Sequence, residues 1–508
     1  MEYQATIGME VHAELRTKTK MFCASKNDPD EKHPNINICP VCAGHPGTLP
    51  TANEDAIKHV QRVGLALGAN VQKFSRFDRK NYFYPDLPKG YQISQYQHPL
   101  VFGGELNGIH ITRVHLEEDT ARLIHNDKND TLVDFNRAGV PLMELVTEPD
   151  LHDAVSARKF CEELQLVLRY LGASDADMEK GQMRCEANIS ISLLSNPVAK
   201  LGTKVEVKNL NSFRAVEEAI EYETERQKKV LEKGEEVMQE TRGWDENKKH
   251  TFSQRKKESA HDYRYFPEPD LPPMEFSDEY IEVLKATIPE LPAQKRARFR
   301  GEYGISEQLV ETLVRGKNLA SFWEKMVSEL RGWISEKGVT HPPNPPSLNL
   351  REGGEIETKS LFGGRVIEAM KIAANYFTSD LLGLIKEKEI LISEILIKPE
   401  EFAELIKMIV QGEISSRAAK DVLRHMVEKG GDPSTIVQDK GLGQLSDEKS
   451  LEESARKIIS QNPNAISDYK KGKTNALQFL VGQVMKETKG AGNPEVIKTL
   501  LTRLIGGV

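Results

Sequence analysis

The chain has 508 residues, of which 38% are hydrophobic and 29% are charged, and its formal net charge at pH 7 is −8. This length allows roughly three or four domains with hydrophobic cores of their own, and it excludes a small scaffold held by disulfides. The negative charge argues against a general nucleic-acid binder, although residues 412–508 are mildly basic, with fifteen Lys and Arg against twelve Asp and Glu.

The first predicted element is a strand in TIGMEVH, residues 6–12. Ile7, Met9 and Val11 fall on one face of such a strand, whereas Glu10 and His12 fall on the other. A carboxylate and an imidazole one strand step apart belong either to a solvated face or to half of a metal site.

The next segment carries a C-x-x-C motif. Cys39 and Cys42, with Cys23 upstream, predict a zinc site of three thiolates. Ser25 stands where a cysteine would complete the site, so the fourth ligand would have to be a histidine of this segment, His33 or His45. The alternative is that the thiols are free and buried.

Residues 79–97, RKNYFYPDLPKGYQISQYQ, interleave basic and aromatic side chains, among them Lys80 and Tyr82. Basic and stacking groups in one turn-rich stretch can hold an unpaired nucleotide. The other interpretation is that the aromatic rings fix a hairpin to the core.

Two later segments place carboxylates where they need a partner. VHLEEDTAR sets Glu117, Glu118 and Asp119 in succession after an apolar-rich strand, where like charges repel unless they are screened. Glu144 stands inside the apolar run AGVPLMELVTEPD and must reach solvent, a basic group or a metal. Sites dominated by carboxylate oxygens suit magnesium, which is usually shared with substrate phosphates.

The clearest strand is MRCEANISISL, residues 183–193, and a shorter one is TKVEVK, residues 203–208. Both have an apolar face and a polar face. The polar faces carry Arg184, Glu186 and Asn188 on the first strand and Glu206 and Lys208 on the second. Such a sheet either turns this face to water or uses it as a site.

The order of elements predicts an α+β fold followed by helices. Residues 1–290 combine alternating stretches and turns with helical periods at 153–171 and 214–233, which indicates a mostly antiparallel sheet with helices. Strand patterns fade from about 274, and the Pro-rich stretch 338–354 is expected to be a loop or insertion. Later helices are expected at 366–377, 401–411, 416–428, 449–460, 472–487 and 494–504. The predicted domains are 1–290, 291–410 and 411–508.

The chain shows no pattern typical of secretion or of a membrane span. Five cysteines do not make a disulfide framework, and no apolar run approaches the ~20 residues that a spanning helix needs. We therefore expect a soluble protein without a membrane partner, in the cytoplasm or in an organelle matrix after removal of a targeting segment.

Motifs of common catalytic machinery are missing. The GKT at 472–474 is not a P-loop, because Ser467 stands where the first glycine belongs, and there is no G-x-S-x-G elbow. No cysteine has a convincing histidine partner. A nucleophile would therefore come from a substrate or a partner.

Several long motifs occur together in one order. They are IGMEVHAELRTKTKMFC, DRKNYFYPDLPKGYQISQ, HLEEDTAR, DFNRAGVPLMELVTEPD, MRCEANISIS, GTKVEVKNLNSFRAVEEAIEYETERQ, QETRGWDE and DYRYFPEPDLPP, and in the tail AAKDVL, NPNAISDYKKGKTNALQFLVGQVMKETKG and NPEVI. This set closely resembles the B-subunit family of the tRNA-dependent amidotransferases. The resemblance covers nearly all of residues 3–290 and resumes in the tail.

The resemblance implies a catalytic domain akin to glutamine synthetase and guanido kinases, then an all-α cradle and an all-α tail that touches tRNA. It implies that ATP phosphorylates the side-chain carboxylate of Glu or Asp esterified to tRNA(Gln) or tRNA(Asn), and that ammonia then displaces the phosphate. It also implies partners: an amidase A subunit that releases ammonia from glutamine, and a small C subunit that completes a heterotrimer.

The family's functional residues map onto positions in this chain. By resemblance, the magnesium ligands are Glu10, His12, Glu118 and Glu144. Phosphate contacts are expected from Lys80, Arg184 and Lys208, with Glu186, Asn188, Glu206 and Tyr82 around the substrate and ATP. Zinc-bearing members have a cysteine where this chain has Ser25, and other members lack the zinc site.

Two other functions stay open at this point. One is a non-catalytic RNA-binding scaffold subunit with a structural zinc knuckle, whose polar sheet face is merely solvated. The other is an ATP-dependent ligase that acts on a free small acid. The sequence does not distinguish Glu-tRNA(Gln) from Asp-tRNA(Asn) as the substrate.

Overall fold

The computed structural model describes residues 2–125, 130–193, 201–256, 263–336, 364–443, 448–488 and 494–506. The chain divides into two compact units, Met1–Pro292 and Ala293–Val508. The Pro-rich stretch 338–354 lies outside the described residues. The predicted boundaries at 290 and 410 stay predictions.

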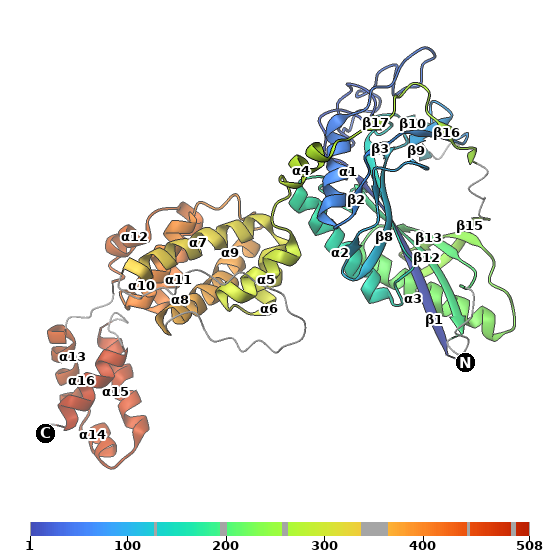
Figure 1. Ribbon diagram of the computed structural model, residues 1–508. Helices are drawn as coiled ribbons and strands as arrows, with labels where there is room; N and C mark the ends of the chain where they lie inside the picture. Colours follow the sequence, from blue (N-terminus) through green and yellow to red (C-terminus); the bar gives the residue numbers. More distant parts are fainter. Residues whose placement is uncertain are drawn as a thin grey trace. The chain divides into compact units, whose positions relative to one another are not determined.

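The first unit is built on one ten-stranded sheet (Figure 1). Its strands are β1 (Tyr3–Glu14), β2 (Asn70–Val71), β6 (Val101–Phe102), β7 (Glu105–Leu106), β8 (Ile109–Glu118), β11 (Pro141–Thr147), β12 (Met183–Leu193), β13 (Val205–Leu210), β14 (Glu240–Asp245) and β15 (His250–Lys256). Their order is β15-β14-β13-β12-β1-β11-β8-β6-β2, with β7 paired to β8. All these pairings are antiparallel except β13 with β14.

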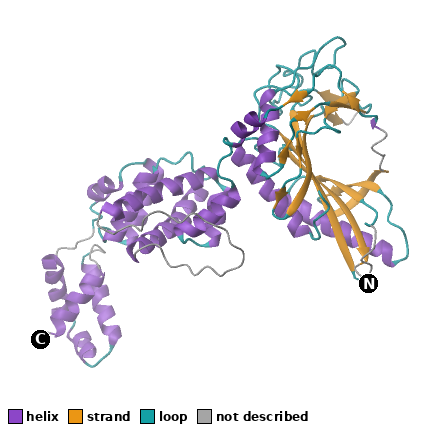
Figure 2. Cartoon of the chain, in the orientation of Figure 1, coloured by secondary structure: helices purple, strands orange, loops and turns teal. Residues whose placement is uncertain are grey.

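One face of this sheet is the main hydrophobic core. Ile7, Met9 and Val11 of the central strand β1 are fully buried there, as their alternation in the sequence predicts. The helices α1 (Glu54–Ala66), α2 (Ala154–Leu171) and α3 (Phe213–Glu232) contribute buried residues to the same core. They lie along one side of the sheet (Figure 2), so the opposite face is left for polar groups.

Each of the three helices begins at a side-chain cap. The side chains of Asn53, Asp153 and Ser212 accept hydrogen bonds from backbone N–H groups in the first turns of α1, α2 and α3. Gly172 ends α2 in the left-handed conformation, with φ of 66°. Local sequence therefore defines both ends of α2.

The first unit also contains one three-stranded sheet and two strand pairs. They are β16 (Phe266–Pro267), β4 (Asp78–Asn81) and β5 (Tyr91–Ser94) in one sheet, β9 (Arg122–His125) with β10 (Thr131–Asp134), and β3 (Phe74–Ser75) with β17 (Met274–Glu275). The helix α4 (Asp278–Lys285) follows. Hydrogen bonds from Gln92 and Ser94 to the carboxylate of Glu117 join the β4–β5 hairpin to the end of β8.

The second unit is built from helices and the turns between them, and its described residues contain one isolated β-bridge, Ile414 with Gly443, but no strand. Its helices are α5 (Pro292–Tyr303), α6 (Glu307–Arg315), α7 (Lys317–Glu336), α8 (Gly364–Asn375), the π-helix η2 (Tyr376–Leu381), α9 (Leu382–Glu387), α10 (Pro399–Gln411), α11 (Ser416–Lys429), α12 (Pro433–Lys440), α13 (Glu448–Gln461), α14 (Pro463–Lys470), α15 (Thr474–Glu487) and α16 (Pro494–Gly506). Trp323, Phe377 and Phe402 pack edge to face in its core. The last four helices have a separate core around Leu451, Leu480 and Leu501.

The predicted α+β class, with a mostly antiparallel sheet and a helical C-terminal region, is confirmed. The strand predicted at 183–193 coincides with β12, whereas the one predicted at 203–208 runs from Val205 to Leu210. Short helices α12 and α14 were not predicted, because each spans only about two turns. Within the described ranges, no helix has the length and apolarity to cross a membrane.

Candidate functional site

The polar face of the sheet gathers charged side chains from five neighbouring strands. The register sets Glu10 of β1 opposite Glu186 of β12, and His12 of β1 opposite Arg184 of β12 and Glu144 of β11. The next strand continues this row, because Glu144 lies opposite His115 of β8. Residues more than 170 positions apart in the sequence thus become neighbours.

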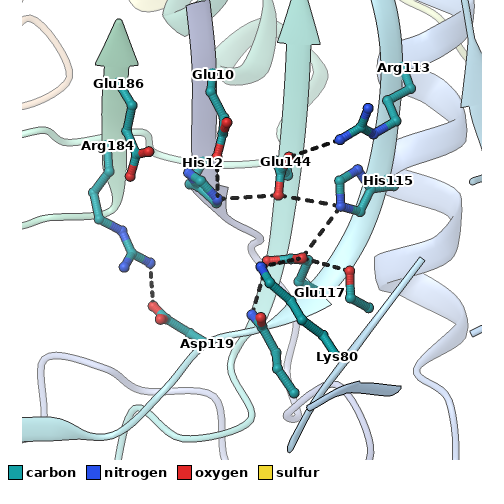
Figure 3. Close-up of polar contacts among 12 residues, drawn as sticks. Glu10, His12, Lys80, Arg113, His115, Glu117, Asp119, Glu144, Arg184 and Glu186 are labelled. Atoms are coloured by element: carbon teal, nitrogen blue, oxygen red, sulfur yellow. Dashed lines mark hydrogen bonds and ion pairs between the residues drawn. The ribbon is translucent and has the colours of Figure 1, made fainter. Parts of the chain in front are cut away.

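Three of the predicted magnesium ligands converge. His12 Nε2 lies 3.8 Å from Glu10 Oε1 and 3.4 Å from Glu144 Oε2 (Figure 3). One ligand atom from each of these residues lies within 4.8 Å of the other two. Two carboxylates and an imidazole at this spacing fit a divalent cation that keeps water or phosphate as its remaining ligands.

The protonation of this trio reflects burial and the charges of neighbouring side chains. Burial, and then the carboxylates of Glu144 and Glu186, raise the pKa of Glu10 to about 7. Burial disfavours the imidazolium of His12, but contact with Glu144 outweighs it and raises the pKa of His12 to about 9. Burial also opposes ionisation of Glu144, yet His115 and His12 hold its pKa well below the usual range. A bound cation would offset both the burial and the repulsion that raise the pKa of Glu10.

A second cluster shares Glu144 with the first. His115 Nε2 lies 3.4 Å from Glu144 Oε2 and 3.5 Å from Glu117 Oε1. Lys80 Nζ, from the β4–β5 hairpin, lies 3.8 Å from Glu117 Oε1. Burial opposes ionisation of Glu117, but Lys80 and His115 lower its pKa to about 2. The hairpin thus delivers a cation to the edge of the proposed metal site.

On the other side, Glu10 approaches a third group of acids. Glu10, Glu186 and Glu206 bring carboxylate oxygens within 4.8 Å of one another. Lys208 Nζ lies 2.7 Å from Glu186 Oε2 and 4.0 Å from Glu206 Oε1, so this group already holds a cation. The Oγ1 of Thr241 donates a hydrogen bond of 2.6 Å to Glu206.

Arg184 lies at the edge of these clusters. Its guanidinium pairs with Asp119, which Arg137 Nε also approaches at 3.6 Å. Burial opposes ionisation of Asp119, but Arg184 and Arg137 lower its pKa. Glu14, on β1, hydrogen-bonds to the same carboxylate and is kept protonated by burial, with its pKa raised to about 8.

Glu118 does not join the trio. It ends β8 opposite Pro141, on the opposite side from Glu117. Its carboxylate accepts hydrogen bonds from Lys89 Nζ at 2.7 Å and from the backbone N–H of Ile93 at 3.0 Å. The structure therefore separates Glu118 from the other three predicted ligands. The sequence-based expectation that Glu117 and Glu118 follow the strand was wrong, because both belong to β8.

Two further predicted site residues lie near these charged side chains. Asn188 stands on β12 opposite Glu206, and its buried Oδ1 has no hydrogen-bond partner within the described part of the chain. The ring of Tyr82 packs edge to face on Tyr263, with centroids 6.0 Å apart. Burial, partly offset by Lys80, raises the pKa of Tyr82 above its usual range. Tyr82 thus accompanies Lys80 and not the trio.

The three cysteines predicted to bind zinc also converge. The sulfur atoms of Cys23, Cys39 and Cys42 lie within 4.8 Å of one another. Ser25 Oγ is 3.8 Å and Lys20 Nζ is 3.9 Å from Cys42 Sγ. A hydrogen bond from Cys23, aided by the N–H of Cys39 and by Lys20, lowers the pKa of Cys42 to about 4. Among the described residues, no histidine completes this cluster.

Sequence reasoning missed His115 and Arg113 as members of the site, and it named Glu117 only as a carboxylate that needs screening. Arg113 Nη2 lies 3.7 Å from Glu144 Oε1. The signal was available, because these three residues alternate with Val114 and Leu116 along one strand and must share its polar face. The pairing of β8 with β11, which brings them to Glu144, has no local signal.

Two family models match separate parts of this chain. The family model described as GatB/GatE catalytic domain matches residues 5–282, and the one described as GatB domain matches residues 364–505. The first match contains every residue of the three acidic clusters.

Full-length relatives carry the name of the B subunit of aspartyl/glutamyl-tRNA(Asn/Gln) amidotransferase. The one from Thermotoga maritima is 45% identical, with 100% of both chains covered. The one from Persephonella marina is 44% identical over 99% of this chain and 100% of its own, and that from Crocosphaera subtropica is 40% identical over 100% and 98%. The chain therefore belongs to the GatB family, the B subunits of aspartyl/glutamyl-tRNA(Asn/Gln) amidotransferases.

Proposed function

We propose that this chain is the subunit that activates and amidates the amino acid on Glu-tRNA(Gln), Asp-tRNA(Asn) or both. The observation that carries the proposal is the convergence of Glu10, His12 and Glu144 on one sheet face, with the cations Lys80, Arg184 and Lys208 around them. The names of the full-length relatives support the same substrates.

The proposed reaction has two steps. An oxygen of the Glu or Asp side-chain carboxylate attacks the γ-phosphorus of ATP, the bond to the β-phosphate oxygen breaks, and ADP leaves. Ammonia then attacks the carbonyl carbon of the acyl phosphate, loses a proton and expels inorganic phosphate, which leaves the amide. The first step needs no general base, because the carboxylate is ionised at pH 7.

The chain's residues act in this scheme by positioning and by charge. Phosphoryl transfer is catalysed mainly in this way. Each of the three cations is held by a carboxylate: Lys80 by Glu117, Arg184 by Asp119 and Lys208 by Glu186. The orientation of these cations is therefore set before substrate arrives. Magnesium held by Glu10, His12 and Glu144 would offset phosphate charge. Asn188, Glu206 and Tyr82 are proposed to surround the nucleotide and substrate.

Further parts of the proposal concern partners and setting. Ammonia would come from a glutaminase A subunit, and a small C subunit would complete a heterotrimer. We also propose that the first unit has the fold of glutamine synthetase and guanido kinases. Zinc bound at the cysteine cluster is a further part of the proposal. So is a location in the cytoplasm or in an organelle matrix. The large, mostly antiparallel sheet of the first unit is compatible with that fold.

The test is ATP hydrolysis and amide formation by the chain assembled with A and C subunits. Each mischarged tRNA is supplied separately, with glutamine or with ammonium. ATP hydrolysis that requires mischarged tRNA, together with amide formation, supports the proposal. Binding of tRNA without ATP hydrolysis would instead indicate a scaffold subunit, and free glutamate used as efficiently as Glu-tRNA(Gln) would indicate a small-acid ligase.

A further inference from the structure

The strand β14 places a buried hydroxyl beside the group of acids formed by Glu10, Glu186 and Glu206. The Oγ1 of Thr241, a residue that is only 1% exposed, donates a hydrogen bond of 2.6 Å to Glu206 Oε2. Thr241 belongs to QETRGWDE, residues 239–246, a motif to which the proposed reaction gives no role. A buried donor on a carboxylate of the site is a candidate for orienting that carboxylate.

The pairing of β14 with β13 brings Thr241 to this place. The register of the two parallel strands sets Thr241 opposite Glu206, so both side chains lie on the polar face of the sheet. The next residue, Arg242, has its Nε 3.5 Å from Oε2 of Glu223, which belongs to the helix α3. Thr241 therefore serves the polar face, whereas Arg242 joins the sheet to its helix layer.

The hydrogen bond from Thr241 fixes how the Glu206 carboxylate is turned. While Oε2 accepts from Thr241, Oε1 lies 4.0 Å from Lys208 Nζ. Lys208 Nζ itself donates to Glu186 Oε2 at 2.7 Å. A buried carboxylate oxygen that loses a hydroxyl donor is left unsatisfied or turns toward another donor, and Lys208 lies within reach of such a turn. Thr241 thus limits the pull of Glu206 on Lys208.

The position of Lys208 matters because it lies beside the proposed magnesium site. Glu186, which holds Lys208, stands opposite Glu10 in the pairing of β12 with β1 (Figure 3). Oxygens of Glu10, Glu186 and Glu206 lie within 4.8 Å of one another. A lysine drawn from Glu186 toward Glu206 would therefore change both the cation offered to phosphate and the charge next to Glu10.

We propose that Thr241 is a positioning residue for the activation step, which acts through Glu206 to keep Lys208 where it contacts the phosphates of ATP. This inference rests on the proposed function and adds to it a residue that sequence reasoning did not single out. The alternative is a purely structural role, because an unsatisfied carboxylate oxygen inside the protein also destabilises the fold.

Thr251 on β15 offers a matched control for the structural role. It is 2% exposed, and its Oγ1 donates a hydrogen bond of 3.0 Å to Glu223 Oε2. Glu223 is fully buried and is not a member of the three acidic clusters. Thr241→Val and Thr251→Val thus remove the same kind of hydrogen bond at similar burial, once beside the proposed site and once beside α3.

The test is single-turnover amide formation with ATP, ammonium and mischarged tRNA, by the chain assembled with its A and C subunits. Thr241→Val should lower the rate roughly 10- to 100-fold, as removal of groups that orient active-site ligands does, with unchanged tRNA affinity. Thr241→Ser keeps the hydroxyl and should keep the rate. Thr251→Val should lose as much stability in denaturant unfolding but keep the wild-type rate.

A double-mutant cycle tests whether Thr241 acts through Glu206. In a Glu206→Gln background, Thr241→Val should lower the rate no further, because the charge whose direction Thr241 fixes is gone. The inference is overturned if Thr241→Val and Thr251→Val lose rate equally, if Thr241→Ser is as slow as Thr241→Val, or if the two losses in the cycle add in full. It then fails alone, provided that the wild type forms amide. A wild type that forms no amide on either mischarged tRNA would instead remove the proposed function.

Discussion

His12 faces Glu144 across the pairing of β1 with β11, and its Nε2 lies 3.4 Å from the Glu144 carboxylate. His115 of β8 also contacts Glu144, and its Nε2 lies 3.4 Å from Glu144 Oε2. One carboxylate thus connects two of the three acidic clusters. The first prediction concerns this residue.

Replacing Glu144 by Gln should weaken magnesium binding and abolish acyl phosphate formation while tRNA affinity stays within about twofold. Loss of a metal-site group costs roughly 10- to 100-fold or more in affinity or activity. Calorimetric titration with magnesium and a single-turnover assay measure the two effects. Glu148→Gln is the control, because Glu148 is exposed just beyond the same strand. Unchanged turnover in Glu144→Gln would contradict the metal assignment.

The neighbours Glu117 and Glu118 should behave differently. Glu117→Gln should reduce turnover, because Glu117 holds Lys80 beside the trio. Glu118→Gln should mainly lower the free energy of unfolding, by ~1.5–3 kcal/mol, because it loosens charged hydrogen bonds to Lys89 and Ile93. Denaturant unfolding and steady-state turnover separate the two. If magnesium affinity falls more in Glu118→Gln, the ligand set implied by the family resemblance is right and this assignment is wrong.

Stability should depend on pH through Glu14. Burial and Asp119 raise its pKa in the folded state to about 8, from 4.5 in the unfolded chain. Between these values the folded state binds more protons, so the free energy of unfolding falls as pH rises from about 4.5 to 8. Glu14→Gln removes this dependence and should raise the free energy of unfolding by on the order of 4–5 kcal/mol over the wild type at pH 8.5, with no gain at pH 4.

Denaturant unfolding in the presence of a chelator, at several pH values, measures the Glu14 effect. Glu235→Gln serves as an exposed control. A difference between Glu14→Gln and wild type that is the same at pH 4 and pH 8.5 would show that Glu14 is not protonated in the folded protein.

The cysteine cluster should respond to a single added sulfur. Ser25 Oγ lies 3.8 Å from Cys42 Sγ, so Ser25→Cys would supply a fourth thiolate to zinc. Zinc affinity, measured by competition with a chromophoric chelator, should rise at least tenfold. Ser156→Cys, in the first turn of α2, controls for an added thiol. If neither the wild type nor Ser25→Cys retains zinc, the thiols are structural.

Removing residues 444–508 should weaken tRNA binding without preventing amide formation at saturating tRNA. The helices α13, α15 and α16 form a core of their own around Leu451, Leu480 and Leu501, so their loss should leave the first unit folded. Filter binding and single-turnover amidation measure the two effects. Loss of amidation at saturating tRNA would show that the tail also takes part in the chemistry.

Part of the site could be predicted from local sequence. The alternation in β1 and β12 places Glu10, His12 and Arg184 opposite the apolar residues of the same strands. The C-x-x-C spacing likewise brings Cys39 and Cys42 together. These predictions hold because side-chain direction in a strand or a tight turn depends only on near neighbours in the chain.

The pairing of β1 with β11 and β12, and of β11 with β8, was decided only by the tertiary structure. Glu144 lies more than 130 residues from His12 in the sequence, and nothing local specifies their register. The end of β8 illustrates the physical reason: because successive side chains of a strand point to opposite faces, a displacement of one residue exchanges Glu117 for Glu118 at the site. The sequence by itself determined the family, the types of side chain offered to the site and the polar face of each strand. Long-range strand pairing selected which of those side chains converge.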